Sequence, residues 1–392
     1  MTTRNARVVV IGGGIVGASI ALGLAQQGAQ VSVHEAGTMG SGTTSTSYGW
    51  VNANGKEPNS YYEINRAGIR AHEVFASESS SDCWFHSTGH LEVATTQSHD
   101  QHLRSRGNAL AARDYLVEEL TVKEAKRLEP SLVIPENVRS IVFFPDEGYI
   151  YPLLYLAETI TQLRAAGGQI YERSTVCGFD SAPTGVIVRT EDGSDYHADY
   201  VVVAAGRSTD QIVQLAGGNV PLLDFAKPGD ITVGYLARTN ALPVKLSRLV
   251  TTAQINVRPE GGGRLLLQAL DLDATADPKQ VPQNDSDMAA EFSQRLQSIL
   301  YGSTRIQIEQ LEVGQRVMPA DGKTIASPVP GMEWMYAVAT HSGVTLAPYL
   351  GSAVAGEILG TVDPLLEDFR LTRFDEQKLV TPPRKPRCPG EQ

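Results

Sequence analysis

The strongest constraint on how this chain folds lies near its N-terminus. Residues 7–36 read RVVVIGGGIVGASIALGLAQQGAQVSVHEA. An apolar run at residues 8–11, typical of a buried parallel strand, ends in three glycines. Ala and Leu then recur at helical spacing until Gly28, and residues 31–34 resume as a strand. This order predicts a strand, a tight turn, a helix and a second strand, as in an α/β fold.

The glycines of this turn follow the pattern G-x-G-x-x-G at Gly12, Gly14 and Gly17. Gly12 permits the tight turn, Gly14 lets the backbone approach a pyrophosphate at the positive end of the helix, and Gly17 lets the helix pack against the strand. Glu35 ends the second strand, where a carboxylate can accept hydrogen bonds from ribose hydroxyls. The pattern predicts a dinucleotide site, with a Gly-rich turn in another α/β protein as the structural alternative. Neighbouring contacts are expected from Ile15, Val16 and Ala36.

The next segment, residues 37–52, reads GTMGSGTTSTSYGWVN and shows neither a helical nor a strand period. Small hydroxyl side chains directly after a ribose-binding acid suit the wrapping of a long cofactor. A flexible surface loop is the alternative. The segment therefore favours FAD over NAD as the dinucleotide.

From this segment onward the chain resembles the D-amino-acid oxidase-like superfamily of FAD-dependent oxidoreductases, which includes glycine oxidase, sarcosine oxidase and D-amino-acid dehydrogenase. Further similar stretches are FPDEGYIYP at 144–152, YVVVAAG at 200–206, and residues 314–350, which open with GQR and end in a turn and helix with TLAP. The resemblance implies additional FAD contacts in the loop, near adenine, at a second pyrophosphate-side turn and at the start of the late helix: Gly42, Thr43, Thr44, Ser47, Gly49, Trp50, Val176, Ala205, Gly206, Gly343, Val344 and Thr345.

The resemblance also implies the fold. A Rossmann-like FAD-binding domain of the α/β class would be interleaved with a mostly antiparallel β-sheet domain for substrate. We expect residues 1–80, 146–222 and 310–380 in the first domain. Residues 81–145 and 223–309 would form the second, with strands near 170–179 in the first and 252–257 in the second. The Pro-rich residues 381–392 are expected to be a disordered tail.

A candidate substrate pocket follows from the same resemblance. Arg316, in GQR, occupies the position where amino-acid-oxidising members carry an arginine, whose planar guanidinium can bind a carboxylate through two hydrogen bonds. His341 falls in the turn before the late helix, and Tyr48 and Trp50 flank a glycine in the loop near the flavin ring. The alternatives are an ion pair for Arg316, a structural turn histidine for His341, and core packing for the two aromatic residues.

Two more candidates come from the predicted strand at 252–257. Gln254 and Asn256 alternate along it and would share one face. Polar side chains at such positions line the pocket in glycine-oxidase-like members. In the similar sarcosine oxidases the flavin is attached through a cysteine just after the G-x-R segment, and the family's alternative is a histidine in the early loop. Here Val317 and Met318 follow Arg316, and no histidine lies near residues 48–50. We therefore predict non-covalent FAD.

These features predict oxidation of the C–N bond of a small amino acid or secondary amine. The α-hydrogen would leave as hydride to flavin N5, the resulting imine would hydrolyse, and O2 or another acceptor would take the electrons. A flavin-dependent monooxygenase and an NAD-linked dehydrogenase share the first motif. The turn at residues 340–343, however, lacks the Gly-Asp pair of aromatic hydroxylases, and the later FAD-like segments disfavour NAD. A flavin-binding subunit of a hetero-oligomeric amine dehydrogenase and a redox-sensing assembly factor remain alternatives.

Charge and composition bear on nucleic-acid binding, on membrane spans and on the cellular compartment. The formal charge of −11, from 33 Lys and Arg against 44 Asp and Glu, disfavours nucleic-acid binding. No apolar run reaches the roughly 18 residues of a membrane span. The three cysteines form no CxxC, which fits a reducing compartment, and we expect a cytoplasmic protein. The sequence leaves open whether the chain forms a homo-oligomer.

Metal and nucleotide-hydrolysis motifs are incomplete in this chain. His86 and His90, and likewise His99 and His102, have spacings compatible with metal binding, but no further ligand completes a set. We expect surface histidines and no metal. The GKT at residues 322–324 lacks the earlier glycine of a P-loop, and no G-x-S-x-G nucleophile motif is present.

Overall fold

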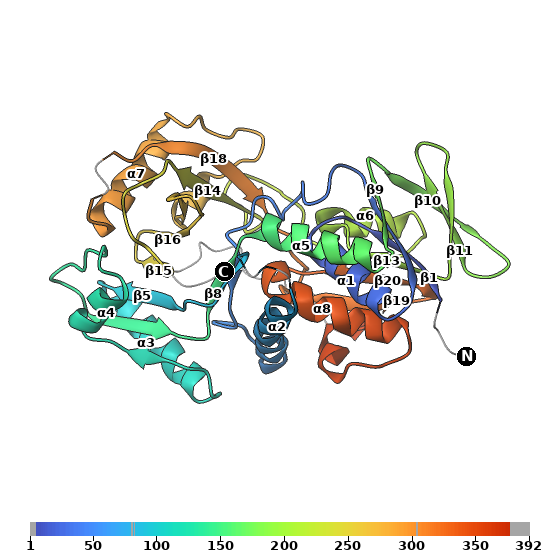
Figure 1. Cartoon of the computed structure of the whole chain (residues 1–392), viewed down its shortest axis with the longest axis horizontal. Helices are drawn as coiled ribbons and strands as arrows, with labels where there is room; N and C mark the ends of the chain where they lie inside the picture. The colour runs from blue at the N-terminus through green and yellow to red at the C-terminus, as the bar shows by residue number, and fades with distance from the viewer. Residues whose placement is uncertain (1–4, 80, 82, 303–304, 377–392) are drawn as a thin grey trace.

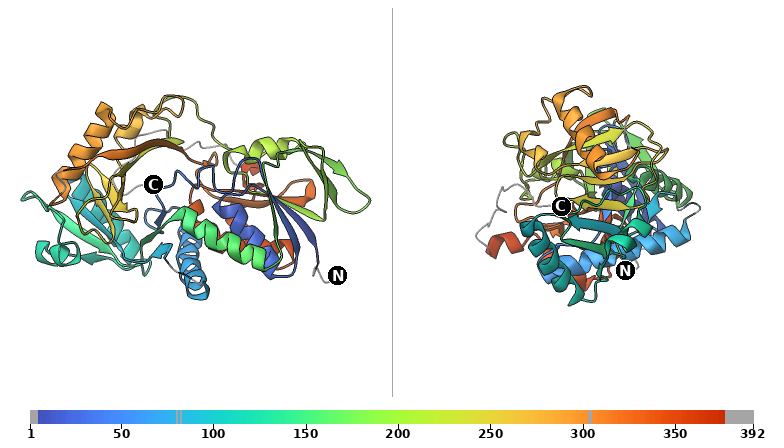
Figure 2. Two further views of the ribbon diagram at one scale, coloured as in Figure 1. Left: turned by 45° about the horizontal axis from the view of Figure 1, so that its top comes forward. Right: turned by 90° about the vertical axis from the view of Figure 1, so that its left-hand side faces the viewer.

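The computed structural model describes residues 5–79, 81, 83–302 and 305–376. The predicted tail at 381–392 lies outside these residues. Two lobes stand side by side, one built on a mainly parallel sheet with helices and the other on a mainly antiparallel sheet (Figures 1 and 2). The predicted fold class is confirmed.

The first lobe is built on a six-stranded sheet in the order β19-β20-β13-β1-β2-β9. All neighbours are parallel except β19 and β20. The strands are β1 (Arg7–Ile11), β2 (Gln30–Glu35), β9 (Gln169–Glu172), β13 (Tyr200–Val203), β19 (Ile325–Val329) and β20 (Met332–Ala339).

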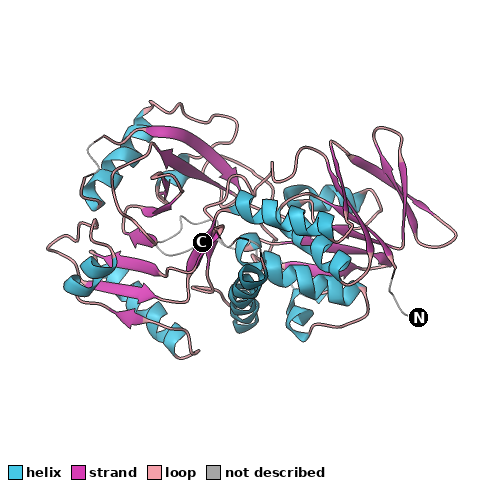
Figure 3. Cartoon of the chain, viewed as in Figure 1, coloured by secondary structure: helices cyan, strands magenta, loops and turns pink. Residues whose placement is uncertain are grey.

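Both faces of this sheet are covered, because successive side chains of a strand point to opposite sides. Val8 and Val10 of β1 pack in the core that includes the helices α1, α2, α5 and α8. Val9 and Ile11 pack on the other side against a three-stranded sheet and the region of α6. Figure 3 shows helices gathered over one face. The elements are α1 (Ile15–Gln26), α2 (Asn59–Glu78), α5 (Pro152–Ala165), α6 (Thr209–Gln214), α8 (Gly343–Ile358), β10 (Val176–Ser181), β11 (Val186–Thr190) and β12 (Asp195–Ala198).

The second lobe is an eight-stranded sheet in the order β18-β14-β17-β16-β15-β5-β7-β6. Every neighbouring pair is antiparallel except β15 and β5. Apolar side chains of α7 pack into its core. The elements are β5 (His90–Ala94), α3 (Gln97–Ala111), β6 (Glu118–Glu119), α4 (Val122–Leu128), β7 (Ser140–Phe144), β14 (Val233–Thr239), β15 (Leu249–Thr252), β16 (Asn256–Pro259), β17 (Leu265–Gln268), α7 (Asp287–Ile299) and β18 (Ile308–Gln315).

Shorter elements join these layers. A small sheet in the order β3-β8-β4 forms where the chain passes between the lobes. The remaining elements are β3 (Trp50–Val51), β4 (Phe85–His86), β8 (Gly148–Ile150), the 3-10 helices η1 (Gly206–Ser208), η2 (Leu272–Thr275) and η3 (Pro364–Phe369), and α9 (Arg373–Glu376). We keep the division into two interleaved domains as a proposal, and note that its boundary at residue 310 falls inside β18.

Each of two predicted continuous strands, at residues 170–179 and 252–257, is interrupted in the structure, so both predictions are wrong. Residues 170–179 form β9 and β10 in different sheets, separated at Arg173, whose φ of 55° turns the chain. Residues 252–257 contain the bend between β15 and β16. The hydroxyl of Thr252 accepts hydrogen bonds from the backbone amides of Gln254 and Ile255 at 3.3 and 3.1 Å, so this turn forms without Gly or Pro.

The contact between α2 and α8 makes stability depend on pH. His72 is buried, and its Nε2 donates to the Val344 carbonyl at 2.8 Å. Burial lowers the pKa of His72 to about 4. In the unfolded chain the pKa of His72 is about 6.5, so protonation favours the unfolded state. The free energy of unfolding is therefore highest above pH 6.5 and falls as the pH drops toward 4.

From His72 alone we expect the free energy of unfolding to fall by about 2 kcal/mol between pH 7 and pH 5. Urea unfolding at both pH values measures it. His72→Gln should flatten this dependence, whereas the exposed His102, changed to Gln, should not. Equal pH dependence in all three proteins would contradict the prediction.

Candidate active site

A cavity of about 390 Å³ lies at the carboxyl ends of the parallel strands and extends to the antiparallel sheet. Ligands bind at this edge in open α/β sheets, because the turns after successive strands meet there. The lining contains all the predicted cofactor residues except Gly17: Gly12, Gly14, Ile15, Val16, Glu35, Ala36, Gly42, Thr43, Thr44, Ser47, Gly49, Trp50, Val176, Ala205, Gly206, Gly343, Val344 and Thr345.

The glycine turn is shaped by close backbone contacts. Gly12 has a φ of 112°, and a Cβ there would lie 2.4 Å from the Ala204 carbonyl oxygen. A Cβ on Gly17 would lie 2.1 Å from the Gly12 carbonyl oxygen, so this glycine sets the approach of α1 to the turn. Its absence from the lining fits the packing role expected for it.

Glu35 holds this turn from the end of β2. Its Oε2 accepts a hydrogen bond from the Gly13 amide at 2.7 Å, and its Oε1 accepts one from the Gly37 amide at 2.8 Å. Each carboxylate oxygen retains capacity for a further donor. The ribose contact expected for Glu35 remains a proposal, and the structure adds an organising role for the two loops beside it.

Glu35→Ala should weaken FAD binding by about 10- to 100-fold, since hydrogen bonds to a charged group contribute about 1.5–3 kcal/mol. Titration of apoprotein with FAD, followed by flavin absorbance, measures the effect. Glu172, the register partner of Glu35 on β9, is the matched control: it accepts a backbone hydrogen bond from Met39 outside the cavity. If Glu172→Ala weakened binding as much, Glu35 would have no special role.

The loop after β2 is tied to both lobes. The Thr44 hydroxyl accepts a hydrogen bond from the Ile15 amide at 3.0 Å, at the start of α1. The Thr43 hydroxyl donates to the Gln315 carbonyl at 2.9 Å, at the end of β18. The wall formed by this loop is therefore positioned by the first helix and by the antiparallel sheet.

The predicted substrate residues divide into two groups. Tyr48, Trp50, Arg316 and His341 all line the cavity. Gln254 and Asn256 do not, and they share no strand face. Gln254 is exposed in the bend after β15 and borders a separate hollow beside α7. Asn256 is buried at the start of β16, where its amide donates to the side-chain oxygen of Gln268 at 3.3 Å.

Sequence reasoning missed five lining residues of the antiparallel sheet: Gly234, Leu236, Gln268, Gly314 and Gln315. Gly234 and Leu236 are two apart on β14, and this period of two is a signal that they share a face. Gln268 could not be found in this way, because its place depends on the pairing of β16 with β17.

Arg316 is held by an ion pair at the edge of the cavity. Its Nη2 donates to Asp273 Oδ2 at 3.2 Å, and its Nη1 donates to the carbonyls of Ile231 and Val233, the former at 3.2 Å. A Cβ on Gly234 would lie 2.3 Å from Arg316 Nη2, so the glycine makes room for the guanidinium. The ion-pair alternative is thus present, with both partners in the antiparallel lobe.

Comparisons with known proteins agree with this geometry. The sequence model of the FAD dependent oxidoreductase family (DAO) matches residues 7–356. The chain belongs to this family. Glycine oxidase of Bacillus licheniformis is 27% identical over 365 residues, which cover 90% of this chain and 92% of the relative. One of the opine oxidase subunits of Rhizobium meliloti is 24% identical over 386 residues, covering 95% and 98%. The crystal structure of glycine oxidase from Geobacillus kaustophilus has the same fold, with a TM-score of 0.81, 23% identity, and coverage of 94% and 99%.

The cavity of this FAD-dependent oxidoreductase fits its cofactor. Glu35 is the only carboxylate in the lining that the described residues form, whereas Arg207 and Arg316 both contribute to it. The positive ends of α1 and α8 face the same cavity, and neither helix has an acidic residue in its first turn. A Cβ on Gly14 would lie 3.3 Å from the Thr44 hydroxyl, in the cradle beside the start of α1. This charge distribution suits a pyrophosphate.

Membrane spans and metal clusters are both absent from the described residues. Within that part of the chain, no helix has the length and apolar character needed to cross a bilayer. Among the same residues, no group of three His, Cys, Asp or Glu side chains is arranged to hold a metal ion. The expectation of surface histidines is wrong for His90 and His99, which are both buried and each lie beside a buried glutamate.

Proposed function

We propose that this protein oxidises the C–N bond of a small amino acid or secondary amine with non-covalently bound FAD. One observation carries the proposal: a single cavity joins the glycine turn of the first lobe to Tyr48, Trp50 and Arg316. A cofactor and a small substrate would therefore share one cavity. FAD, when bound, supplies a hydride acceptor.

The residues of the chain would bind and orient the substrate. Arg316 would bind a substrate carboxylate, which would share or replace the Asp273 contact. Tyr48, Trp50 and Leu236, buried and on the cavity wall, would contact the apolar part of the substrate and exclude water. Holding the substrate in one orientation is the main contribution expected from the protein. The α-hydrogen leaves as hydride, the amine proton passes to water, and the imine product then hydrolyses.

The visible spectrum of the purified protein tests the proposal. We expect a flavin spectrum, release of free FAD on denaturation, and anaerobic bleaching by at least one member of a panel of D-, L- and N-methyl amino acids. Mixing the bleached protein with O2 then distinguishes an oxidase from a dehydrogenase. A colourless protein that FAD cannot reconstitute would refute the cofactor, and a flavoprotein that no amine bleaches would refute the reaction.

A second candidate is a flavin-binding subunit that acts with a partner. The full-length similarity to an opine oxidase subunit favours it. In that case the purified chain alone would hold FAD, and bleaching by an amine would require a protein that copurifies from the native source.

A further inference from the structure

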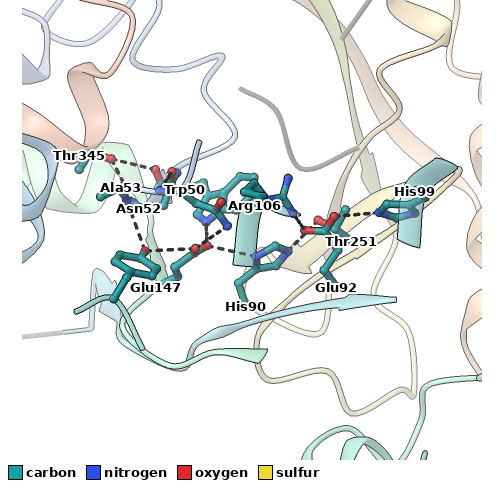
Figure 4. Close-up of polar contacts among 12 residues, drawn as sticks. Trp50, Asn52, Ala53, His90, Glu92, His99, Arg106, Glu147, Thr251 and Thr345 are labelled. Atoms are coloured by element: carbon teal, nitrogen blue, oxygen red, sulfur yellow. Dashed lines mark hydrogen bonds and ion pairs between the residues drawn. The ribbon is translucent and has the colours of Figure 1, made fainter. Parts of the chain in front are cut away.

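A buried polar network contacts Trp50 and is centred on a residue to which the proposed chemistry assigns no role (Figure 4). Its centre is Glu147, in the turn between β7 and β8, whose side chain is 0% exposed. Oε2 of Glu147 accepts a hydrogen bond from Trp50 Nε1 at 2.7 Å. Oε1 accepts hydrogen bonds from Asn54 Nδ2 at 2.9 Å and from the Tyr115 hydroxyl at 3.1 Å.

These donors belong to the segment that forms the cavity wall or contact it directly. Trp50 lines the cavity, and Asn54 follows it in the same segment. The Tyr115 hydroxyl also accepts a hydrogen bond from the Ala53 amide at 3.4 Å. On the other side, the Thr345 hydroxyl, at the start of α8, bonds to the Trp50 carbonyl and to the backbone amide two residues later, both at 3.3 Å. Residues 50–54 are thus held between Glu147 and α8.

The network continues into the antiparallel lobe through His90 of β5. His90 Nδ1 lies 3.1 Å from Glu147 Oε2, without the alignment of a hydrogen bond. Its ring meets the Trp50 ring edge-on at 4.6 Å, and its Nε2 forms a 2.9 Å hydrogen bond with the Thr251 hydroxyl on β15. The position of Trp50 is therefore set by contacts with both lobes.

A neighbouring cluster, centred on Glu92, is a buried ion pair with which the environment of Glu147 can be compared. Glu92, also on β5 and fully buried, accepts a hydrogen bond from His99 at 2.8 Å and is paired with Arg106. Burial opposes ionisation of Glu92, but the charge of Arg106 and the His99 hydrogen bond lower its pKa to about 2. In contrast, no described Lys or Arg lies within 4 Å of the Glu147 carboxylate, which accepts its hydrogen bonds from Trp50, Asn54 and Tyr115.

A buried carboxylate stabilised mainly by neutral donors constrains those donors strongly, because each lost hydrogen bond leaves a polar group buried without a partner. We propose that Glu147 is a positioning residue that fixes Trp50 and residues 50–54 as the wall of the FAD and substrate cavity. The inference rests on the proposed function only in placing flavin and amine beside Trp50.

Glu147→Gln tests the proposal, because the amide keeps the shape but replaces one acceptor oxygen with a donor. We expect a shifted flavin absorbance band and a KM for the amine raised about tenfold, with a smaller change in kcat. The matched control is Glu92→Gln, which disrupts an equally buried carboxylate on the same strand as His90 without touching Trp50. It should lower the melting temperature but leave the spectrum and KM unchanged.

A second variant keeps the proposal testable if Glu147→Gln fails to fold. Trp50→Phe removes the indole N–H together with part of the ring and should reproduce the spectral shift. Adding Glu147→Gln to it should then shift the spectrum less than it does in the wild-type protein, because only the bonds to Asn54 and Tyr115 remain to be lost. If both variants kept the wild-type spectrum and KM while only the melting temperature fell, the positioning role would be overturned. The spectrum of bound FAD reports on Trp50 even if no amine is oxidised, so this result is separable from failure of the proposed reaction.

Discussion

Replacing Arg316 with Met should lower kcat/KM for a carboxylate-bearing amine by about 30- to 4000-fold. Removing one partner of a buried, hydrogen-bonded charge pair raises the free energy of the bound state by about 2–5 kcal/mol, and 1.4 kcal/mol corresponds to a factor of ten. Arg316→Lys should restore activity only partly, because an ammonium group is a point charge and cannot bind a carboxylate through two parallel hydrogen bonds. Steady-state kinetics with a carboxylate substrate and with the corresponding simple amine measures the effect.

Two controls separate substrate binding from stability. Arg295 on α7 is similarly shielded, with 13% of its side chain exposed against 15% for Arg316, and it forms an ion pair with Asp271 outside the cavity. Arg295→Met should leave kcat/KM unchanged. Because Arg316→Met also leaves Asp273 without its cation, the double variant with Asp273→Asn should recover stability but not activity. Equal losses for the carboxylate substrate and the simple amine would contradict carboxylate binding by Arg316.

Gly17→Val should weaken FAD binding by about 5- to 150-fold. A Cβ at this position would lie 2.1 Å from the Gly12 carbonyl oxygen, which is backbone and cannot rotate away. Either α1 or the glycine turn must move, and overpacking of this kind disfavours the native arrangement by about 1–3 kcal/mol. The moved turn is the one that lines the cavity, so the effect should appear in the FAD dissociation constant as well as in the melting temperature.

Gly178→Val is the matched control for this change. Gly178 lies on β10, and a Cβ there would meet no heavy atom within 4 Å. Its variant should bind FAD as the wild type does. Retention of wild-type FAD affinity by Gly17→Val would show that the close approach of α1 to the turn is not needed for the cofactor site.

The sequence predicted the nucleotide-binding unit well, because its signals are local. The strand, the glycine turn, the helix and the acid at its end lie within residues 7–36, and each depends on the neighbouring residues alone. The late turn and helix around Gly343 were predicted for the same reason. The interrupted strands were missed, since the bend after Thr252 is formed by a side-chain hydroxyl rather than by Gly or Pro.

The amino-acid sequence by itself thus predicted the nucleotide-binding unit, because period and glycine spacing are properties of the chain. The resemblance of its ordered motifs to a known family implied the fold class, the FAD-dependent family and the other stretches of chain that meet the cavity. Only the tertiary structure decided which side chains face the cavity from the antiparallel sheet and which buried charges hold its wall. Gln268 reaches the cavity through strand register, Arg316 meets Asp273 across 43 residues, and Glu147 contacts Trp50 across 97. Such contacts depend on how distant segments pack, and a linear pattern does not encode them.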